Sequence, residues 1–293
     1  MSKALPHARL PLALLLLALA LASVKGAAPL SVTDDTGTEL RLSRAPGRII
    51  SLTPAATECL FALGLEREIV GVTRYCDYPA AAKAKDKVGD LNLDYEKIIA
   101  LRPDLLVAVG DLPAQSRQRL RALDLPLLAF SPTDLASTMK VLDKLGRATA
   151  RTIAAAAVVN GMQRRIRLVA NRLKGVQKRP RIFVEIWMDP VMTAGPGTFT
   201  AELIDLAGGQ DIAHDAKPWS PFSQELVVAR DPEIIISQCA SASQIRSRSG
   251  WEQIEAVRRG RVHDVDPNIF SRPGPRLVEA LETLARLVHP ERF

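Results

Sequence analysis

The sequence has few of the side chains that usually build catalytic or metal sites. Its 293 residues include only four histidines and three cysteines. The cysteines are Cys59, Cys76 and Cys239. No C-x-x-C or metal-finger spacing occurs, and His214, His263 and His289 lie far apart without a ligand-like spacing. The sequence therefore predicts no metal site and a fold that does not depend on disulfides, although an oxidising compartment would permit one.

Motifs of several enzyme classes are also missing. The chain has no G-x-x-x-x-G-K-[ST], H-E-x-x-H or G-x-S-x-G, and residues 195–200 (GPGTFT) lack the third glycine of a dinucleotide fingerprint. We therefore expect no enzymatic activity. A secreted hydrolase that uses carboxylates such as Asp77 and Asp189 stays open as an alternative class, because acid–base catalysis needs only well-placed acids.

Strong positive charge is absent too, since the formal net charge of the whole chain is only +7. A local basic run at residues 164–181 contains no aromatic residue. Proteins that bind single-stranded nucleic acid need such residues for base stacking. We expect the basic run to be a solvated helix face, and we expect no nucleic-acid partner.

Only the N-terminus carries a long apolar run. Lys3 and Arg9 precede the run at residues 10–22, and small residues follow around Gly26 and Ala27, which is the layout of a secretory signal peptide. The run is shorter than the roughly 20 residues that a membrane-spanning helix needs. We expect residues 1–26 to be a cleaved signal peptide, with no cysteine placed to carry a lipid. A retained signal anchor is the alternative.

Beyond this segment, strands and helices alternate as in parallel βαβ units. A possible hairpin comes first, and the expected strands are residues 48–52, 68–73, 104–110, 126–131, 181–187, 233–237 and 262–265. The first strand runs directly into a helix, with Thr53 as N-cap and Pro54 at the first helical position. In α/β folds such junctions lie at the carboxyl ends of strands, where ligand crevices form.

Residues 135–174 break the alternation. They are rich in Ala, Leu, Arg and Lys and contain no Pro, which predicts one long helix that tolerates Gly146 and Gly161. We therefore expect an N-terminal α/β lobe (27–134), a bridging helix (135–174) and a C-terminal α/β lobe (175–293). The parallel sheets of both lobes would be flanked by helices. One large domain with an embedded helix is the alternative.

An internal repeat supports two similar lobes. Residues 95–107 (YEKIIALRPDLLV) and 224–236 (QELVVARDPEIII) align without a gap, placing Glu96 on Glu225. Both segments predict a short helix, a turn marked by Pro and a buried strand.

Aromatic residues are scarce, at 4% of the chain, and several fall in loop-like segments flanked by Pro or Gly. These are Tyr75, Tyr78, Trp187, Trp219, Phe222 and Phe270. Aromatic side chains in loops often face a ligand, because they offer flat apolar area at little entropic cost. Their spread over both lobes predicts a cleft. An adhesion module whose aromatics face a protein partner stays open.

These segments resemble the periplasmic substrate-binding proteins of ABC importers for cobalamin, haem and ferric siderophores, most closely the cobalamin branch. The resemblance covers nearly all of the chain after residue 26. It rests on motifs in the family's order: residues 31–65, VGVTRYCDYP, YEKIIALRPDLLV, TAGPGTFTAELIDLAGG, KPWSPFSQE and SRPGPRLVEAL. It implies two lobes bridged by a long helix, a ligand in the cleft between them, and little closure on binding.

The resemblance also implies which side chains contact the ligand. Positions that match cleft residues of the cobalamin branch are Tyr75, Trp219, Phe270 and Arg272, and Asn268 matches an acidic position. Asp77 is a further polar candidate, and Cys76 could touch a metal-centred ligand, with a bystander thiol as the alternative. Where the branch has a tryptophan, this chain has Gly89 and Asp90, and Trp187 is a candidate replacement.

The resemblance further implies that Glu96 and Glu225 dock onto the two subunits of a membrane permease. We therefore expect a monomeric periplasmic protein that captures a corrinoid such as cobalamin, without a catalytic cofactor, and delivers it to an ABC importer with its ATPase. Haem or a ferric siderophore is the alternative ligand.

Overall fold

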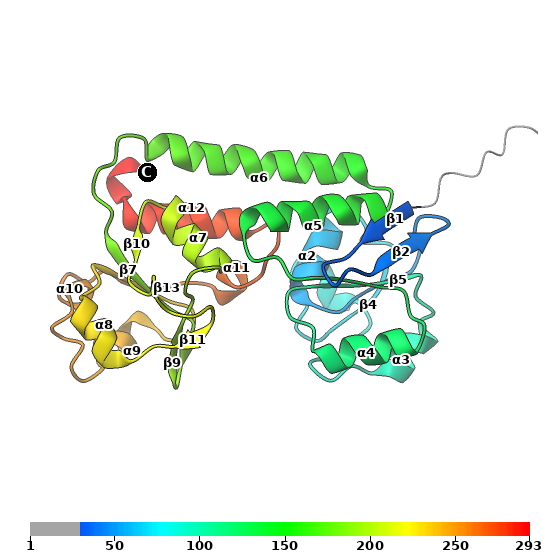
Figure 1. The fold of residues 1–293 in the computed structure, drawn as a ribbon, viewed down its shortest axis with the longest axis horizontal. Coiled ribbons are helices and arrows are strands. Elements are labelled where there is room, and N and C mark those ends of the chain that lie inside the picture. Colours follow the sequence, from blue (N-terminus) through cyan, green and yellow to red (C-terminus); the bar gives the residue numbers. More distant parts are fainter. Residues whose placement is uncertain (1–29) are drawn as a thin grey trace, which may run out of the picture.

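The computed structural model describes residues 30–293 and shows two α/β lobes (Figure 1). Each lobe contains a four-stranded parallel sheet, with the order β4-β3-β5-β6 in the N-terminal lobe and β10-β7-β12-β13 in the C-terminal lobe. These sheets confirm the predicted fold class. The predicted signal peptide lies outside the described residues.

The N-terminal lobe begins with an antiparallel hairpin, as expected. Its strands are β1 (Leu30–Thr33), β2 (Glu39–Leu42), β3 (Ile49–Ser51), β4 (Ile69–Val72), β5 (Leu105–Val109) and β6 (Leu127–Phe130). Its helices are α2 (Pro54–Ala62), η1 (Ala80–Ala84), α3 (Tyr95–Ala100) and α4 (Ala114–Ala122). Every residue of β5 is buried, because helices and loops cover both faces of a parallel sheet.

The C-terminal lobe repeats this plan and adds a small antiparallel sheet, β11-β9-β8. Its strands are β7 (Arg181–Glu185), β8 (Trp187–Met188), β9 (Val191–Thr193), β10 (Gln210–Asp211), β11 (Ser220–Pro221), β12 (Ile234–Ser237) and β13 (Val262–Asp264). Its helices are α7 (Phe199–Leu206), α8 (Gln224–Arg230), α9 (Ala242–Arg246), α10 (Glu255–Arg258), α11 (Pro267–Phe270), α12 (Leu277–Val288) and η2 (Pro290–Arg292). The internal repeat is confirmed, since α3 precedes β5 as α8 precedes β12, and both strands lie inside their sheets.

The prediction of one continuous helix over residues 135–174 is wrong. The segment forms two helices, α5 (Leu135–Ala148) and α6 (Thr152–Arg172), which fold back against each other (Figure 1). Ala150 takes a left-handed conformation, with φ +55°, and so ends the first helix. Gly146 allows the close approach, because a Cβ there would lie 2.4 Å from the Cβ of Ala155.

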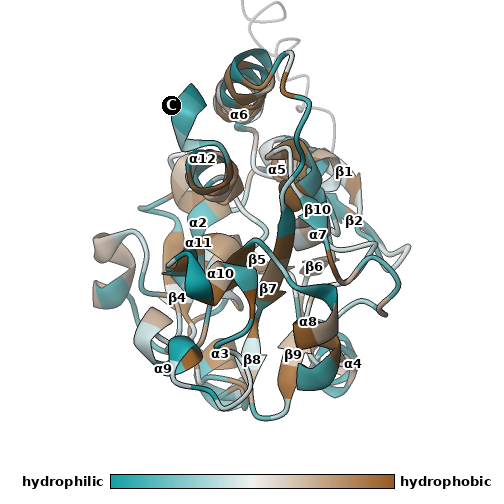
Figure 2. Ribbon diagram, turned by 90° about the vertical axis from the view of Figure 1, so that its left-hand side faces the viewer, coloured by the Kyte–Doolittle hydropathy of each residue, from teal (hydrophilic) through white to brown (hydrophobic). Residues whose placement is uncertain are grey.

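As a result, α6 alone runs along both lobes, over about 32 Å for its 21 residues. One cluster of buried apolar side chains joins the lobes beneath it, with members in α2, α5, α6, α7 and α12. Figure 2 shows apolar residues along the interior strands β5 and β7. Within residues 30–293, no helix is both long and apolar enough to cross a membrane.

Candidate ligand-binding cleft

The start of α2 is fixed to the carboxyl end of the N-terminal sheet. The Thr53 hydroxyl accepts hydrogen bonds from the backbone N–H groups of Ala56 (3.4 Å) and Val109 (3.0 Å), and donates one to the Val109 carbonyl (2.8 Å). Thr53 is therefore the N-cap, as predicted, and also joins α2 to β5.

The start of α7 has the equivalent place in the C-terminal lobe. Thr198 caps it by accepting from the N–H of Ala201 (3.2 Å), and its hydroxyl donates to the carbonyl of Gly195 (2.8 Å). Both lobes thus present a capped helix start beyond the ends of their strands, where crevices form in open α/β sheets.

Two adjoining hollows lie between the lobes, one of about 160 Å³ and one of about 410 Å³. Four residues line both: Gly110, Asp111, Ser271 and Pro273. The smaller hollow includes the start of α2, and the larger includes the start of α7. Together they form the cleft, and the predicted position of the β3–α2 junction on its wall is confirmed.

Two of the predicted aromatic residues line the cleft. Tyr75 borders the smaller hollow and is 55% exposed, and Trp219 borders the larger and is 43% exposed. Trp219 packs against Phe199, with 5.3 Å between ring centroids, and its φ of +49° is strained for a bulky residue. Such strain persists where the surroundings hold it, often at ligand sites.

Two other predicted contacts are wrong. Phe270 is the last residue of α11 and turns into the core, where it is 3% exposed. Cys76 is also in the core, at 1% exposure, with its Sγ 3.1 Å from the Thr73 hydroxyl. Neither side chain faces the cleft. All three cysteines are free thiols, and burial raises the pKa of Cys59.

Arg272 lines the smaller hollow, but its charge is already paired. Its Nη1 lies 2.7 Å from Asp77 and 3.1 Å from Glu58. Burial acts to raise the pKa of the Asp77 carboxyl, yet the hydrogen bond and charge of Arg272 outweigh it and hold the pKa below its ordinary value. The predicted polar pair therefore exists as an ion pair at the edge of the cleft.

The remaining predicted ligand contacts, Asn268 and Trp187, lie beside the cleft or outside it. Asn268 is half-buried, and its backbone N–H donates to Asp266 (2.9 Å). Trp187 is 58% exposed in β8, and its indole N–H donates to the carbonyl of Asp189 (3.0 Å). Neither Asn268 nor Trp187 is among the residues that line the two hollows.

A tight turn at Gly89 brings an apolar side chain to the smaller hollow. Gly89 has φ +102°, and a Cβ there would lie 2.3 Å from the carbonyl oxygen of Asn92, so this tight turn requires glycine. The turn places Leu91 at the smaller hollow, where it is 70% exposed. The only sequence signal for it is an apolar residue two positions after a glycine in a segment without a clear helix or strand pattern.

The charges that line the cleft are few. They are Asp90, Asp111 and Arg272. Because Arg272 is paired with two carboxylates, the lining contains no unpaired cation. Among residues 30–293 there is also no group of three His, Cys, Asp or Glu side chains that could hold a metal ion.

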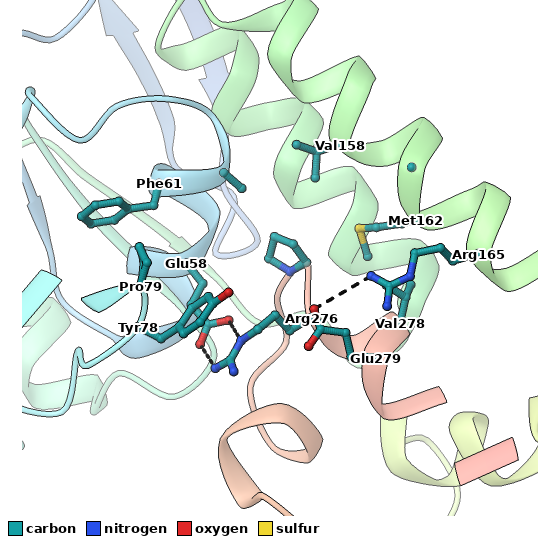
Figure 3. Close-up of a pocket in the computed structure, with 13 residues that line it drawn as sticks. Glu58, Phe61, Tyr78, Pro79, Val158, Met162, Arg165, Arg276, Val278 and Glu279 are labelled. Carbon is teal, nitrogen blue, oxygen red and sulfur yellow. Dashed lines mark hydrogen bonds and ion pairs between the residues drawn. The ribbon is translucent and has the colours of Figure 1, made fainter. Parts of the chain in front are cut away.

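A second cavity, of about 430 Å³, lies away from the cleft between α2, α6 and the start of α12 (Figure 3). Arg276 donates to both carboxylate oxygens of Glu58, at 2.8 and 2.6 Å, and its guanidinium lies 3.9 Å from the centre of the Tyr78 ring. Arg165 on α6 faces Glu279 at 3.9 Å. These contacts tie residues 272–276 of the C-terminal segment to the N-terminal lobe.

The predicted docking residues, Glu96 and Glu225, are exposed in the first turns of α3 and α8. Figures 1 and 2 show both helices on the side of the molecule opposite α6, one in each lobe. The two carboxylates therefore have equivalent places in the two lobes.

Comparison with known proteins identifies the family. A family model described as "Periplasmic binding protein" matches residues 49–269. The chain belongs to this family. The resemblance seen in the sequence is thereby confirmed.

Relatives of this periplasmic binding protein carry different descriptions. It is 32% identical over 273 residues to an uncharacterized ABC transporter substrate-binding lipoprotein, YvrC, of Bacillus subtilis, covering 90% of this chain and 87% of that protein. It is 30% identical over 247 residues to a vitamin B12-binding protein of Yersinia pestis, covering 83% and 87%. A solved structure of a possible iron-binding periplasmic protein from Staphylococcus epidermidis superposes with a TM-score of 0.76 at 29% identity, covering 84% of this chain and 100% of that one.

Proposed function

We propose that this protein captures a corrinoid in the cleft between its lobes and delivers it to an ABC importer, without catalysing a reaction. The observation that carries the choice of ligand is the charge of the cleft. Its lining has two carboxylates and no unpaired cation, and aromatic side chains stand in both hollows. The relatives named as a vitamin B12-binding protein and an ABC transporter substrate-binding lipoprotein support the proposal.

The rival ligands fit this lining less well. Corrinoids carry neutral carboxamide groups around a flat ring, whereas haem carries two carboxylates and many siderophores are anionic. An anion placed near Asp90 and Asp111 would be repelled, and Arg272 is not free to compensate. A hydrolase is also disfavoured, because Asp77 is paired with Arg272 and Asp189 is exposed in a turn away from the hollows.

Ligand binding tests the proposal directly. Purified protein is titrated with cyanocobalamin, cobinamide, haemin and a ferric siderophore, and binding is followed by equilibrium dialysis. We expect micromolar or tighter binding of the corrinoids and at least tenfold weaker binding of the other two. A preference for haemin or the siderophore would replace the corrinoid as ligand.

The Trp219→Ala variant tests the place of binding. Loss of a stacking surface is expected to weaken corrinoid binding about tenfold, or about 1.4 kcal/mol. Trp187→Ala is the matched control, since Trp187 is also exposed but lies outside both hollows. Equal losses in the two variants would contradict binding in this cleft.

A further inference from the structure

The cavity of about 430 Å³ in Figure 3 is separate from the ligand cleft, and we call it the α2–α6 cavity. Its volume lies within the range of about 300–1,000 Å³ that is usual for small-molecule sites, and it matches that of the larger hollow of the cleft, about 410 Å³. None of the residues that line the α2–α6 cavity lines either hollow. The protein therefore has a second concave site of ligand size.

The walls of the α2–α6 cavity are mainly apolar and come from both sides of the junction between the lobes. Phe61 and Pro79 belong to the N-terminal lobe. Val158 belongs to α6, and Pro275 to the segment before α12. All four are half-buried, so part of each remains accessible. Met162 extends from α6 toward the N-terminal lobe (Figure 3).

The charged side chains that line the α2–α6 cavity are already paired. Arg276 donates to both carboxylate oxygens of Glu58, at 2.8 and 2.6 Å. Arg165 donates to both oxygens of Glu282, at 2.8 Å each, and faces Glu279 at 3.9 Å. The lining itself contains two acids and two bases, so it has no surplus charge to balance an ionic ligand. An uncharged molecule fits this lining best.

Gly161 gives independent support for a bound molecule. It lies inside α6, on the same face as Val158 and Met162, and lines the α2–α6 cavity with them. A Cβ at Gly161 would meet only the end of the Arg164 side chain, at 3.8 Å, so no close packing requires glycine there. Glycine is unfavourable inside a helix compared with alanine. Its effect here is to keep this wall of the cavity open.

We propose that the α2–α6 cavity is a second ligand-binding site, which takes a small, uncharged and mainly apolar molecule. The molecule contacts α2 of the N-terminal lobe together with α6 and the start of α12. Its binding therefore stabilises the arrangement of the two lobes. The proposal does not depend on which ligand occupies the cleft, so it stands or falls separately from the proposed function.

An uncharged fluorescent probe, N-phenyl-1-naphthylamine, tests the site, because its emission rises in apolar surroundings. We expect micromolar binding by wild type. Gly161→Leu and Ala62→Phe add apolar side chains to opposite walls of the cavity and are each expected to weaken probe binding at least tenfold. Ala170→Leu adds a side chain at an exposed position of α6 outside the cavity, and this control should bind as wild type.

The Trp219→Ala variant separates the α2–α6 cavity from the cleft and should bind the probe as wild type does. Loss of probe binding in Trp219→Ala, with binding retained in Gly161→Leu and Ala62→Phe, would place the probe in the cleft and overturn the proposal. No binding by wild type, or equal losses in Ala170→Leu and the two filling variants, would overturn it as well.

Thermal unfolding guards against a misfolded variant. Filling the cavity is expected to leave the unfolding midpoint of the free protein unchanged or to raise it, and saturating probe should raise the midpoint of wild type but not that of the filling variants. If Gly161→Leu does not fold, Ala62→Phe decides, because Ala62 is an exposed residue at the end of α2. Wild-type probe affinity in a folded Ala62→Phe would then overturn the proposal.

Discussion

Glu58 is a buried charge at one of the contacts between the lobes. It is 3% exposed and accepts hydrogen bonds from Arg272 and Arg276, which lie on the loop before α12. A buried carboxylate is costly unless it is paired, and a guanidinium left without its partner is costly too. This one carboxylate therefore pairs with two guanidiniums from the other end of the sequence, one of which it shares with Asp77.

Removing that charge should weaken the folded state strongly. Glu58→Gln is expected to lower the free energy of unfolding by about 3 kcal/mol, because Arg276 loses its counterion and Arg272 keeps only Asp77. Urea unfolding measures the change. The control is Glu39→Gln, whose pair with Arg41 is exposed, and it should leave stability unaltered. Equal stability of wild type and Glu58→Gln would contradict the role given to this pair.

Asp211 should make stability depend on pH. Burial raises the pKa of its carboxyl from 3.8 to about 6. Below pH 3.8 the Asp211 carboxyl is protonated in both the folded and the unfolded chain. As pH rises from 3.8 to about 6, the unfolded chain loses this proton before the folded chain does, so the free energy of unfolding falls. Asp211→Asn should therefore be more stable than wild type at about pH 8, by at most about 3 kcal/mol, and equally stable below about pH 4.

Asp215 provides the contrast with Asp211. Its hydrogen bond to Arg230 lowers the pKa of the carboxyl to about 2, so its stabilising effect is present at neutral pH and is lost only as pH falls toward that value. Asp215→Asn should consequently give no gain at about pH 8. Urea midpoints at the two pH values compare the variants, and a similar gain in both would argue against burial as the cause at Asp211.

At the scale of elements, local patterns were enough to predict seven of the eight strands in the two parallel sheets, the Thr53 cap and the repeated helix–strand unit, but they missed β10 and the small sheet β11-β9-β8. They could not predict the break between α5 and α6. Ala150 has no conformational signal for its φ of +55°, and no Gly or Pro follows Gly146 before residue 152. The break is stabilised by the packing of the two helices, which is a tertiary effect.

Replacing Gly146 and Gly161 by alanine should therefore change the free energy of unfolding in opposite directions. Gly146→Ala places a Cβ 2.4 Å from that of Ala155 and is expected to lower the free energy of unfolding by about 1–3 kcal/mol. Gly161→Ala, within α6, meets only the end of the flexible Arg164 side chain at 3.8 Å and should raise it by about 0.5–1 kcal/mol. Urea unfolding of both variants tests this, and a stabilising Gly146→Ala would contradict the close packing.

At the scale of the whole molecule, several contacts hold the lobes together. Besides α6 and the Glu58 pairs, Glu202 on α7 accepts from the backbone N–H of Leu135 at the start of α5 (2.7 Å). Burial raises the pKa of the Glu202 carboxyl. These links oppose a wide hinge motion.

The arrangement of the two lobes also decides which cleft residues could be predicted from the sequence. Tyr75 and Trp219 lie in loops at the cleft, as expected from their flanking Pro and Gly. The inward turn of Phe270 depends on how distant segments pack, so no local pattern reveals it.

The equivalent lobes yield a prediction for docking. Glu96→Arg combined with Glu225→Arg should leave ligand affinity unchanged and abolish uptake by the importer, since the resemblance implies that these two carboxylates dock onto the permease and the double variant reverses both charges. Asp143→Arg, exposed on α5 near the opposite side, is the control and should support normal uptake. Normal uptake by the double variant would rule out these positions as docking sites.

The long sequence separation within the Glu58 network affects biosynthesis. Arg272 and Arg276 follow Glu58 by 214 and 218 residues. When a ribosome has made only the first half of the protein, Glu58 has been synthesised but Arg272 and Arg276 have not. The N-terminal lobe therefore still lacks the arginines that pair with Glu58. Completion of the first-made lobe thus waits for almost the last-made residues, because a truncated chain lacks both arginines that pair with Glu58 in the finished chain.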